Sequence, residues 1–125
     1  MNLTTLEQSK KLKEWGAPQD TEKYWSCDKA IYADRSFDNS DMFSLTSQVD
    51  EHSIGFAAYD LESLIAWLPQ SHKVRFSGTL CLQSYPHNKK WRAGYSNGDT
   101  WQLWRDAETP LAAAFELGRT IHEKQ

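Results

Sequence analysis

The stretch that decides the fold is Trp91-Arg-Ala-Gly-Tyr95, followed by Ser96-Asn-Gly-Asp99 and then Thr100-Trp-Gln-Leu-Trp104. Two short runs of alternating residues flank an Asn-Gly pair, which is the strongest short-range signal for a β-hairpin because both residues adopt positive φ readily. We therefore expect a hairpin that turns at Asn97-Gly98 and contains three of the six tryptophans.

Two registers of this hairpin are compatible with the sequence. A two-residue loop would pair Tyr95 with Thr100 and leave both faces of mixed polarity. A three-residue loop over 96–98, with Gly98 in the left-handed conformation, separates an apolar face from a polar one. The apolar face would hold Trp91, Ala93, Tyr95, Trp101 and Leu103, and the polar face Arg92, Gly94, Thr100, Gln102 and Trp104. We prefer this second register, which predicts a core of Trp91, Tyr95, Trp101 and Leu103.

Size and composition indicate an ordinary globular protein. The 125 residues predict a single domain over 1–125, and 39% hydrophobic with 25% charged residues is typical of a soluble chain. A net charge of -3, without a dense Lys/Arg run, makes nucleic acid an unlikely partner. No apolar run approaches the roughly 18 residues that a membrane span needs. Without a signal peptide, Cys27 and Cys81 are expected as free thiols of a cytoplasmic protein.

Three helices have recognisable ends. Thr4 with Glu7 predicts a capping box for a first helix that Gly16 and Pro18 end. Asp60 is the expected N-cap of a short helix that Pro69 ends. Thr109, followed by Pro110, begins the last helix. Its expected buried stripe is Leu111, Ala114, Phe115, Gly118 and Ile121.

The sequence signals for strands are weaker than those for the helix ends. Residues 24–25, 30–33 and 42–47 are candidate strands, and 73–82 is a half-buried strand with a kink expected at Gly78. A turn over 85–89 leads into the hairpin. Because consecutive strands are joined by turns, we expect an α+β fold, with an antiparallel sheet of three or more strands and three helices mainly on one face.

No pattern of catalytic or metal-binding residues is present. The histidines His52, His72, His87 and His122 are scattered singly, without metal-ligand spacing. Asp34, Asp38 and Asp41 share a loop that lacks the glycine and final glutamate of a calcium site. No glycine-rich phosphate loop occurs. We therefore expect neither a metal, nor a cofactor, nor an enzymatic reaction, although a small enzyme using Cys81 or a histidine stays an alternative.

Binding is the remaining kind of function. Arg92 and Trp104 would share the outer face of the hairpin, and both residue types are enriched at interface hot spots. Two interpretations are open at Trp104, since it either forms a binding surface or lies beneath the last helix or a loop. The burial of most aromatic residues favours the second. Tyr24 and Trp25 form a second candidate binding segment.

Four motifs of the sequence are similar to motifs of known proteins. They are Leu3-Thr-Thr-Leu-Glu-Gln-Ser-Lys-Lys-Leu with Trp15-Gly-Ala-Pro-Gln, Ala58-Tyr-Asp-Leu-Glu-Ser-Leu-Ile-Ala-Trp-Leu-Pro69, Trp91-x-Ala-x-Tyr95, and Glu108-Thr-Pro-Leu-Ala-Ala-Ala114. In these motifs the chain resembles small, largely uncharacterised proteins encoded by phages and prophages. The resemblance leaves residues 20–55 unmatched, and it implies a context in the cytoplasm of a bacterial host rather than any catalytic residue.

Together these observations predict a non-catalytic accessory protein of phage or prophage type that binds a host protein, for example to inhibit host defence. The alternative is a protein that binds or sequesters a small, nucleotide-like ligand, because aromatic rings stack on bases and arginine contacts phosphate. The sequence does not specify the oligomeric state.

Overall fold

The computed structural model describes residues 3–34, 36, 38–68 and 79–123. It contains two compact units, Leu3–Tyr59 (the N-terminal unit) and Asp60–Gln125 (the C-terminal unit). Each has an antiparallel sheet of three strands, and four α-helices lie in the described residues, so the predicted α+β class is confirmed. None of the described helices is both long enough and apolar enough to cross a membrane. The expectation of one domain over 1–125 stays a prediction.

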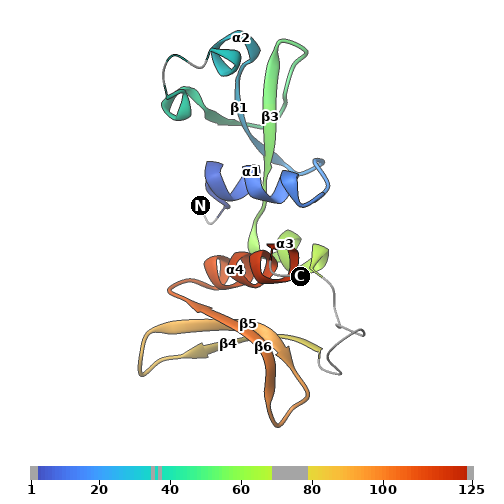
Figure 1. The fold of residues 1–125 in the computed structure, drawn as a ribbon, viewed down its shortest axis with the longest axis vertical. Helices are drawn as coiled ribbons and strands as arrows, with labels where there is room; N and C mark the ends of the chain where they lie inside the picture. The colour runs from blue at the N-terminus through green and yellow to red at the C-terminus, as the bar shows by residue number, and fades with distance from the viewer. Residues whose placement is uncertain (1–2, 35, 37, 69–78, 124–125) are drawn as a thin grey trace. The chain divides into compact units, whose positions relative to one another are not determined.

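The N-terminal unit is a sheet with a helix across one face (Figure 1). Along the chain come α1 (Leu6–Glu14), β1 (Lys23–Asp28), α2 (Lys29–Ala33), the 3-10 turn η1 (Ser40–Met42), β2 (Ser44–Thr46) and β3 (Ser53–Ala58). The sheet order is β2-β1-β3. Its core is formed by Cys27, Phe43 and Phe56, against which Leu6, Trp25, Tyr32 and Ile54 pack.

The start of α1 differs by one residue from the expected one. Thr5 is the N-cap and forms the capping box with Gln8, so the prediction of Thr4 and Glu7 is wrong. Thr4 is instead fully buried, and its hydroxyl accepts a hydrogen bond from the Tyr59 amide at 2.9 Å. It also lies 2.8 Å from the Ser9 hydroxyl. A tertiary contact with the end of β3 therefore decides which threonine caps the helix.

Strand predictions in this unit are only partly correct. The candidate at 24–25 lies within β1 and the candidate at 42–47 contains β2, but residues 30–33 lie in α2 rather than in a strand. The Asp28 carboxylate accepts a hydrogen bond from the Ala30 amide at 2.8 Å and so begins that helix. The sequence does not predict β3, because Ile-Gly-Phe-Ala-Ala lacks alternation of apolar and polar residues.

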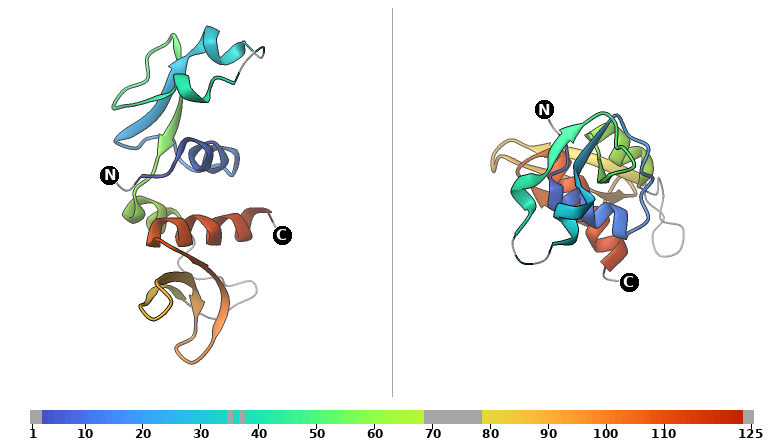
Figure 2. Two further views of the ribbon diagram at one scale, coloured as in Figure 1. Left: turned by 90° about the vertical axis from the view of Figure 1, so that its left-hand side faces the viewer. Right: turned by 90° about the horizontal axis from the view of Figure 1, so that it is seen from above.

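The C-terminal unit is a three-stranded meander with α4 across one face (Figures 1 and 2). Its elements are α3 (Leu61–Trp67), β4 (Thr79–Tyr85), β5 (Lys90–Ser96), β6 (Trp101–Ala107) and α4 (Pro110–Glu123), with sheet order β4-β5-β6. Asp60 caps α3 through the Ser63 amide at 2.8 Å, as predicted. Pro69 and residues 73–78 of the expected strand, including Gly78, lie outside the described residues.

The last helix is as predicted. The Thr109 hydroxyl accepts a hydrogen bond from the Ala112 amide at 3.1 Å, and Pro110 is the first helical residue. All five residues of the expected stripe are buried, together with Ala113 and Leu117. This stripe covers the face of the sheet on which Ala93 and Tyr95 are fully buried. Burial raises the pKa of Tyr95 to about 12.

The hairpin forms as expected but in a different register. Its last pair is Ser96 with Trp101, which leaves a four-residue loop over 97–100 with Gly98 at φ +99°. The next pair is Tyr95 with Leu103, so Gln102 is an extra residue on β6, a β-bulge. The preferred three-residue loop is therefore wrong.

Candidate functional site

The bulge at Gln102 decides which side chains gather on the outer face of the C-terminal sheet, the face opposite α4. Side chains alternate along a strand, so Trp101 and Trp104 would normally point to opposite faces. One extra residue between them brings both to the same face as Arg92. The predicted core position of Trp101 is therefore wrong, whereas Trp91, Tyr95 and Leu103 do share the other face.

Arg92 is the centre of this outer face. Its guanidinium carbon lies 4.8 Å from the ring centroid of Tyr85, 5.0 Å from that of Trp104 and 5.5 Å from that of Trp101. A guanidinium within about 6 Å of an aromatic ring is attracted by the ring quadrupole. One arginine on the middle strand thus contacts rings from both neighbouring strands. We call Tyr85, Arg92, Trp101, Trp104 and Asp106 the aromatic–arginine cluster.

Asp106 fixes the position of that arginine. It lies directly opposite Arg92 across β5 and β6, and the two form a bidentate ion pair. The Nε of Arg92 donates to Oδ1 of Asp106 at 2.7 Å, and Nη2 donates to Oδ2 at 3.0 Å. This hydrogen bonding lowers the pKa of the Asp106 carboxyl and raises that of Arg92. The cluster therefore holds a charged pair whose charges largely cancel.

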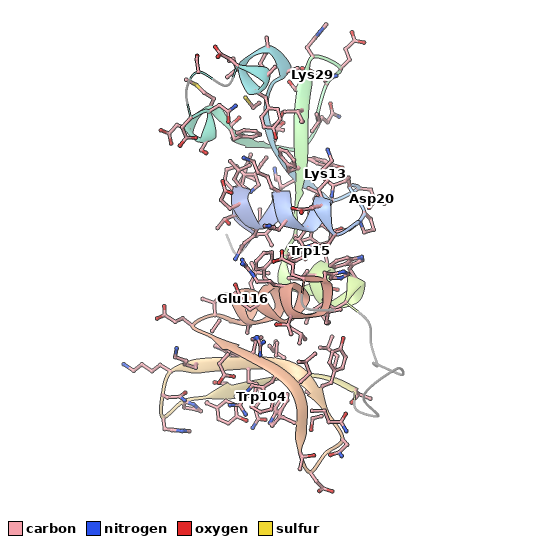
Figure 3. All side chains as sticks on the ribbon, in the orientation of Figure 1. Lys13, Trp15, Asp20, Lys29, Trp104 and Glu116 are labelled. Atoms are coloured by element: carbon pink, nitrogen blue, oxygen red, sulfur yellow. The ribbon has the colours of Figure 1, made fainter. Side chains whose placement is uncertain are left out.

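Trp104 is the exposed ring of the cluster. Its side chain stands among the sticks of the C-terminal sheet in Figure 3, and 39% of the residue is accessible to solvent. The interpretation that placed it beneath the last helix or a loop is wrong, because α4 covers the opposite face of the sheet. Trp104 and Arg92 are thus brought together on one accessible surface, as the alternative interpretation predicts.

Tyr24 and Trp25, the second candidate segment, lie on β1 of the N-terminal unit. The Tyr24 hydroxyl donates to the Gln19 carbonyl at 3.0 Å. The indole Nε1 of Trp25 donates to the Thr4 carbonyl at 2.9 Å, and its ring packs on the core of that unit. Both polar groups are engaged within the fold, which gives these two residues a structural role.

The sequence interpretation missed three members of the cluster. The predicted turn over 85–89 includes Tyr85, although Tyr85 is the last residue of β4 and pairs with Lys90. Trp101 joins the cluster only because of the bulge, and Asp106 joins it only because the register places it opposite Arg92. Neither feature can be read from the local sequence. The one available signal was the pair of opposite charges on the two hairpin strands, since such pairs stabilise antiparallel strands when they face each other.

Groups suited to acid–base or metal chemistry are dispersed. Within the described part of the chain, no group of three or more His, Cys, Asp or Glu residues could hold a metal ion. Cys27 is buried, which raises the pKa of its thiol, and Cys81 is half-exposed on β4. His122 stacks on Trp67 with centroids 5.0 Å apart. His72 lies outside the described residues.

The aromatic–arginine cluster is suited to contact rather than to reaction. A guanidinium stays protonated near neutral pH, so Arg92 offers planar stacking and hydrogen bonds but no proton transfer. Comparisons with protein-family models, with curated proteins and with solved structures give no match. The functional interpretation therefore depends on the geometry of this cluster.

Proposed function

We propose that this chain is a non-catalytic binding protein that recognises another protein through the aromatic–arginine cluster. The observation that carries the proposal is the exposed indole of Trp104 stacked beside Arg92 on a face that α4 leaves uncovered. Trp, Tyr and Arg are the residues most enriched at interface hot spots, and four of the five cluster residues are of these types.

Rigidity supports the same proposal. The ion pair with Asp106 and the ring contacts hold Arg92 in place before any partner arrives. A side chain that is ordered in the free protein loses less conformational entropy on binding, where each immobilised flexible side chain costs about 0.5–1.5 kcal/mol. The cluster is thus preorganised for a partner.

The charges favour a protein over a phosphate-bearing ligand. Because Asp106 already occupies the Nε and Nη2 edge of the Arg92 guanidinium, a phosphate would have to compete with a carboxylate at hydrogen-bond distance. The exposed indole nevertheless favours a nucleotide-like ligand as the second candidate, since a base can stack on it. Titration with ATP and with adenosine, followed by tryptophan fluorescence, tests this candidate, and an unchanged spectrum would exclude it.

The resemblance to phage and prophage proteins suggests where the partner is found. We propose a host protein in the bacterial cytoplasm, such as a component of host defence. The test is affinity capture from bacterial lysate with the wild-type chain and with Trp104→Ala, quantified by mass spectrometry. Met42→Ala is the control, because Met42 is 54% exposed in the N-terminal unit and lies outside the cluster.

The expected result is a protein that wild type and Met42→Ala enrich and that Trp104→Ala loses. Once purified, that protein should bind Trp104→Ala about tenfold or more weakly than wild type, as for a hot-spot residue. Equal binding to all three chains, or no enriched protein at all, would refute the proposal.

A further inference from the structure

The area of the outer face limits what can occupy it. Each of its three strands has seven residues. With a rise of ~3.3 Å per residue and a strand spacing of ~4.8 Å, the face measures roughly 300 Å². A stable interface between folded proteins, including a dimer, buries about 800 Å² on each partner. The described face is therefore smaller than the interface that a globular surface or a second copy needs, and its size fits a short segment of chain.

The backbone of such a segment receives no hydrogen-bond ladder from the face of a sheet. Ladders form only at sheet edges, whereas the rings of the cluster lie on the face of the sheet. A segment lying across the rings must keep its backbone hydrated or internally satisfied. The polyproline II conformation does so, because its backbone has no internal hydrogen bonds and proline has no amide hydrogen.

The charges and rings of the cluster match the same kind of segment. Arg92 and Asp106 are paired with each other, so their charges largely cancel at the centre of the face, and Lys90 at the start of β5 adds a single positive charge beside the pair. The exposed ring of Trp104, with the half-buried rings of Trp101 and Tyr85, offers flat apolar surface. Aromatic-lined surfaces of this kind dock proline-rich segments, whose rings are uncharged and already held in the extended conformation.

We propose that the outer face of the β4-β5-β6 sheet binds a proline-rich, extended segment of the partner protein. This inference rests on the proposed function, because it names the part of the partner that contacts the aromatic–arginine cluster. At ~3.1 Å per residue, a segment of about five to seven residues spans the face. Trp104 provides the exposed platform, and Arg92 is a positioning residue that holds the three rings.

The test is a titration of the ¹⁵N-labelled full chain with a decaproline peptide, followed by the indole N–H signals in two-dimensional NMR spectra. A glycine–serine decapeptide and an amphipathic helical peptide of equal length serve as control probes. Trp104→Ala and the control Met42→Ala are titrated in the same way, and circular dichroism checks that each variant folds. Competition of decaproline with the captured partner on the wild-type chain tests the inference without any variant.

We expect decaproline to shift the Trp104 and Trp101 indole signals saturably and to displace the captured partner. Trp104→Ala should weaken decaproline binding about tenfold or more, and Met42→Ala should leave it unchanged. Unchanged indole signals with decaproline, or tighter binding of the helical probe, would overturn the inference. If the partner still requires Trp104 in that case, the proposed function stands. If the partner binds Trp104→Ala as well as wild type, the proposed function fails too.

Discussion

Gly94 on β5 lies directly opposite Trp104 on β6, so close that a β-carbon at position 94 would come within 2.7 Å of the Cα and Cβ of Trp104. It would also meet the carbonyl oxygen of Leu103. The absence of a side chain at position 94 thus allows the close approach of the two strands that carry Arg92 and Trp104. A glycine within a strand often marks such an approach.

Gly94→Ala should therefore destabilise the chain. The added methyl group would meet backbone atoms that cannot rotate away, and overpacking of this kind typically costs about 1–3 kcal/mol. We expect a lower midpoint of urea unfolding, followed by the near-ultraviolet circular dichroism of the tryptophans. Asp99→Ala is the control, because Asp99 is exposed in the loop of the same hairpin. Equal losses for the two variants would contradict the close approach.

Stability at acid pH should depend on Asp106. The hydrogen bond from Arg92 holds the pKa of this carboxyl below its ordinary value of 3.8. The ion pair therefore stabilises the folded chain above about pH 4 and loses its effect as the pH falls through the lowered pKa. At pH 7, Asp106→Asn should cost under about 1 kcal/mol, because the pair is partly exposed.

Urea unfolding of wild type and Asp106→Asn at pH 7 and pH 3 measures this dependence. The difference between the two chains should narrow at pH 3, where the pair contributes less. Asp99→Asn, in the exposed loop of the same hairpin, serves as the control. A difference that widens at low pH would contradict the role given to the ion pair.

Thr4→Val should destabilise the N-terminal unit. The substitution keeps the shape of the side chain but removes the hydroxyl that bonds to the Tyr59 amide and contacts the Ser9 hydroxyl. Leaving these buried groups without a partner costs about 1–3 kcal/mol. Thermal unfolding of Thr4→Val measures the loss. Thr5→Ala should cost about 0.5–2 kcal/mol through the helix cap alone, and an unchanged Thr4→Val would show that the buried hydroxyl does not matter.

At alkaline pH, stability should fall as unfolding releases the buried phenol of Tyr95. Burial raises its pKa from 10.0 to about 12 in the folded chain, so the unfolded chain loses its proton first. Stability therefore declines from about pH 10 upward, until the pH passes the folded pKa near 12. Tyr95→Phe should flatten this decline in urea titrations between pH 9 and pH 11.5. Part of the slope should remain, since burial likewise raises the pKa of Tyr59 to about 12.

Features that depend on neighbours in sequence could be predicted. Asp60 and Thr109 cap their helices as expected, because a capping side chain bonds to an amide only two or three residues away. The buried stripe of α4 follows from its helical period. The position of the hairpin follows from Asn97-Gly98, which requires only the local conformation of the turn.

Features that depend on contacts between residues far apart in the sequence could not be predicted. Thr4 is withdrawn from capping by the Tyr59 amide, 55 residues away. β3 becomes a strand by pairing with β1, although its own residues do not alternate. The binding role of Arg92, Trp104, Tyr24 and Trp25 stays a prediction, but the structure gives the last two residues partners within the fold.

The sequence by itself determined the α+β class and the position of the hairpin, because periodicity and turn chemistry are encoded locally. It also predicted that Arg92 and Trp104 share a face, but from a three-residue loop that does not form. Only the tertiary structure decided that Trp101 and Asp106 join them and that α4 leaves this face uncovered. The physical reason is the single extra residue at Gln102. A bulge reverses the facing of the residues beyond it, and its location is set by the pairing of whole strands rather than by any local pattern.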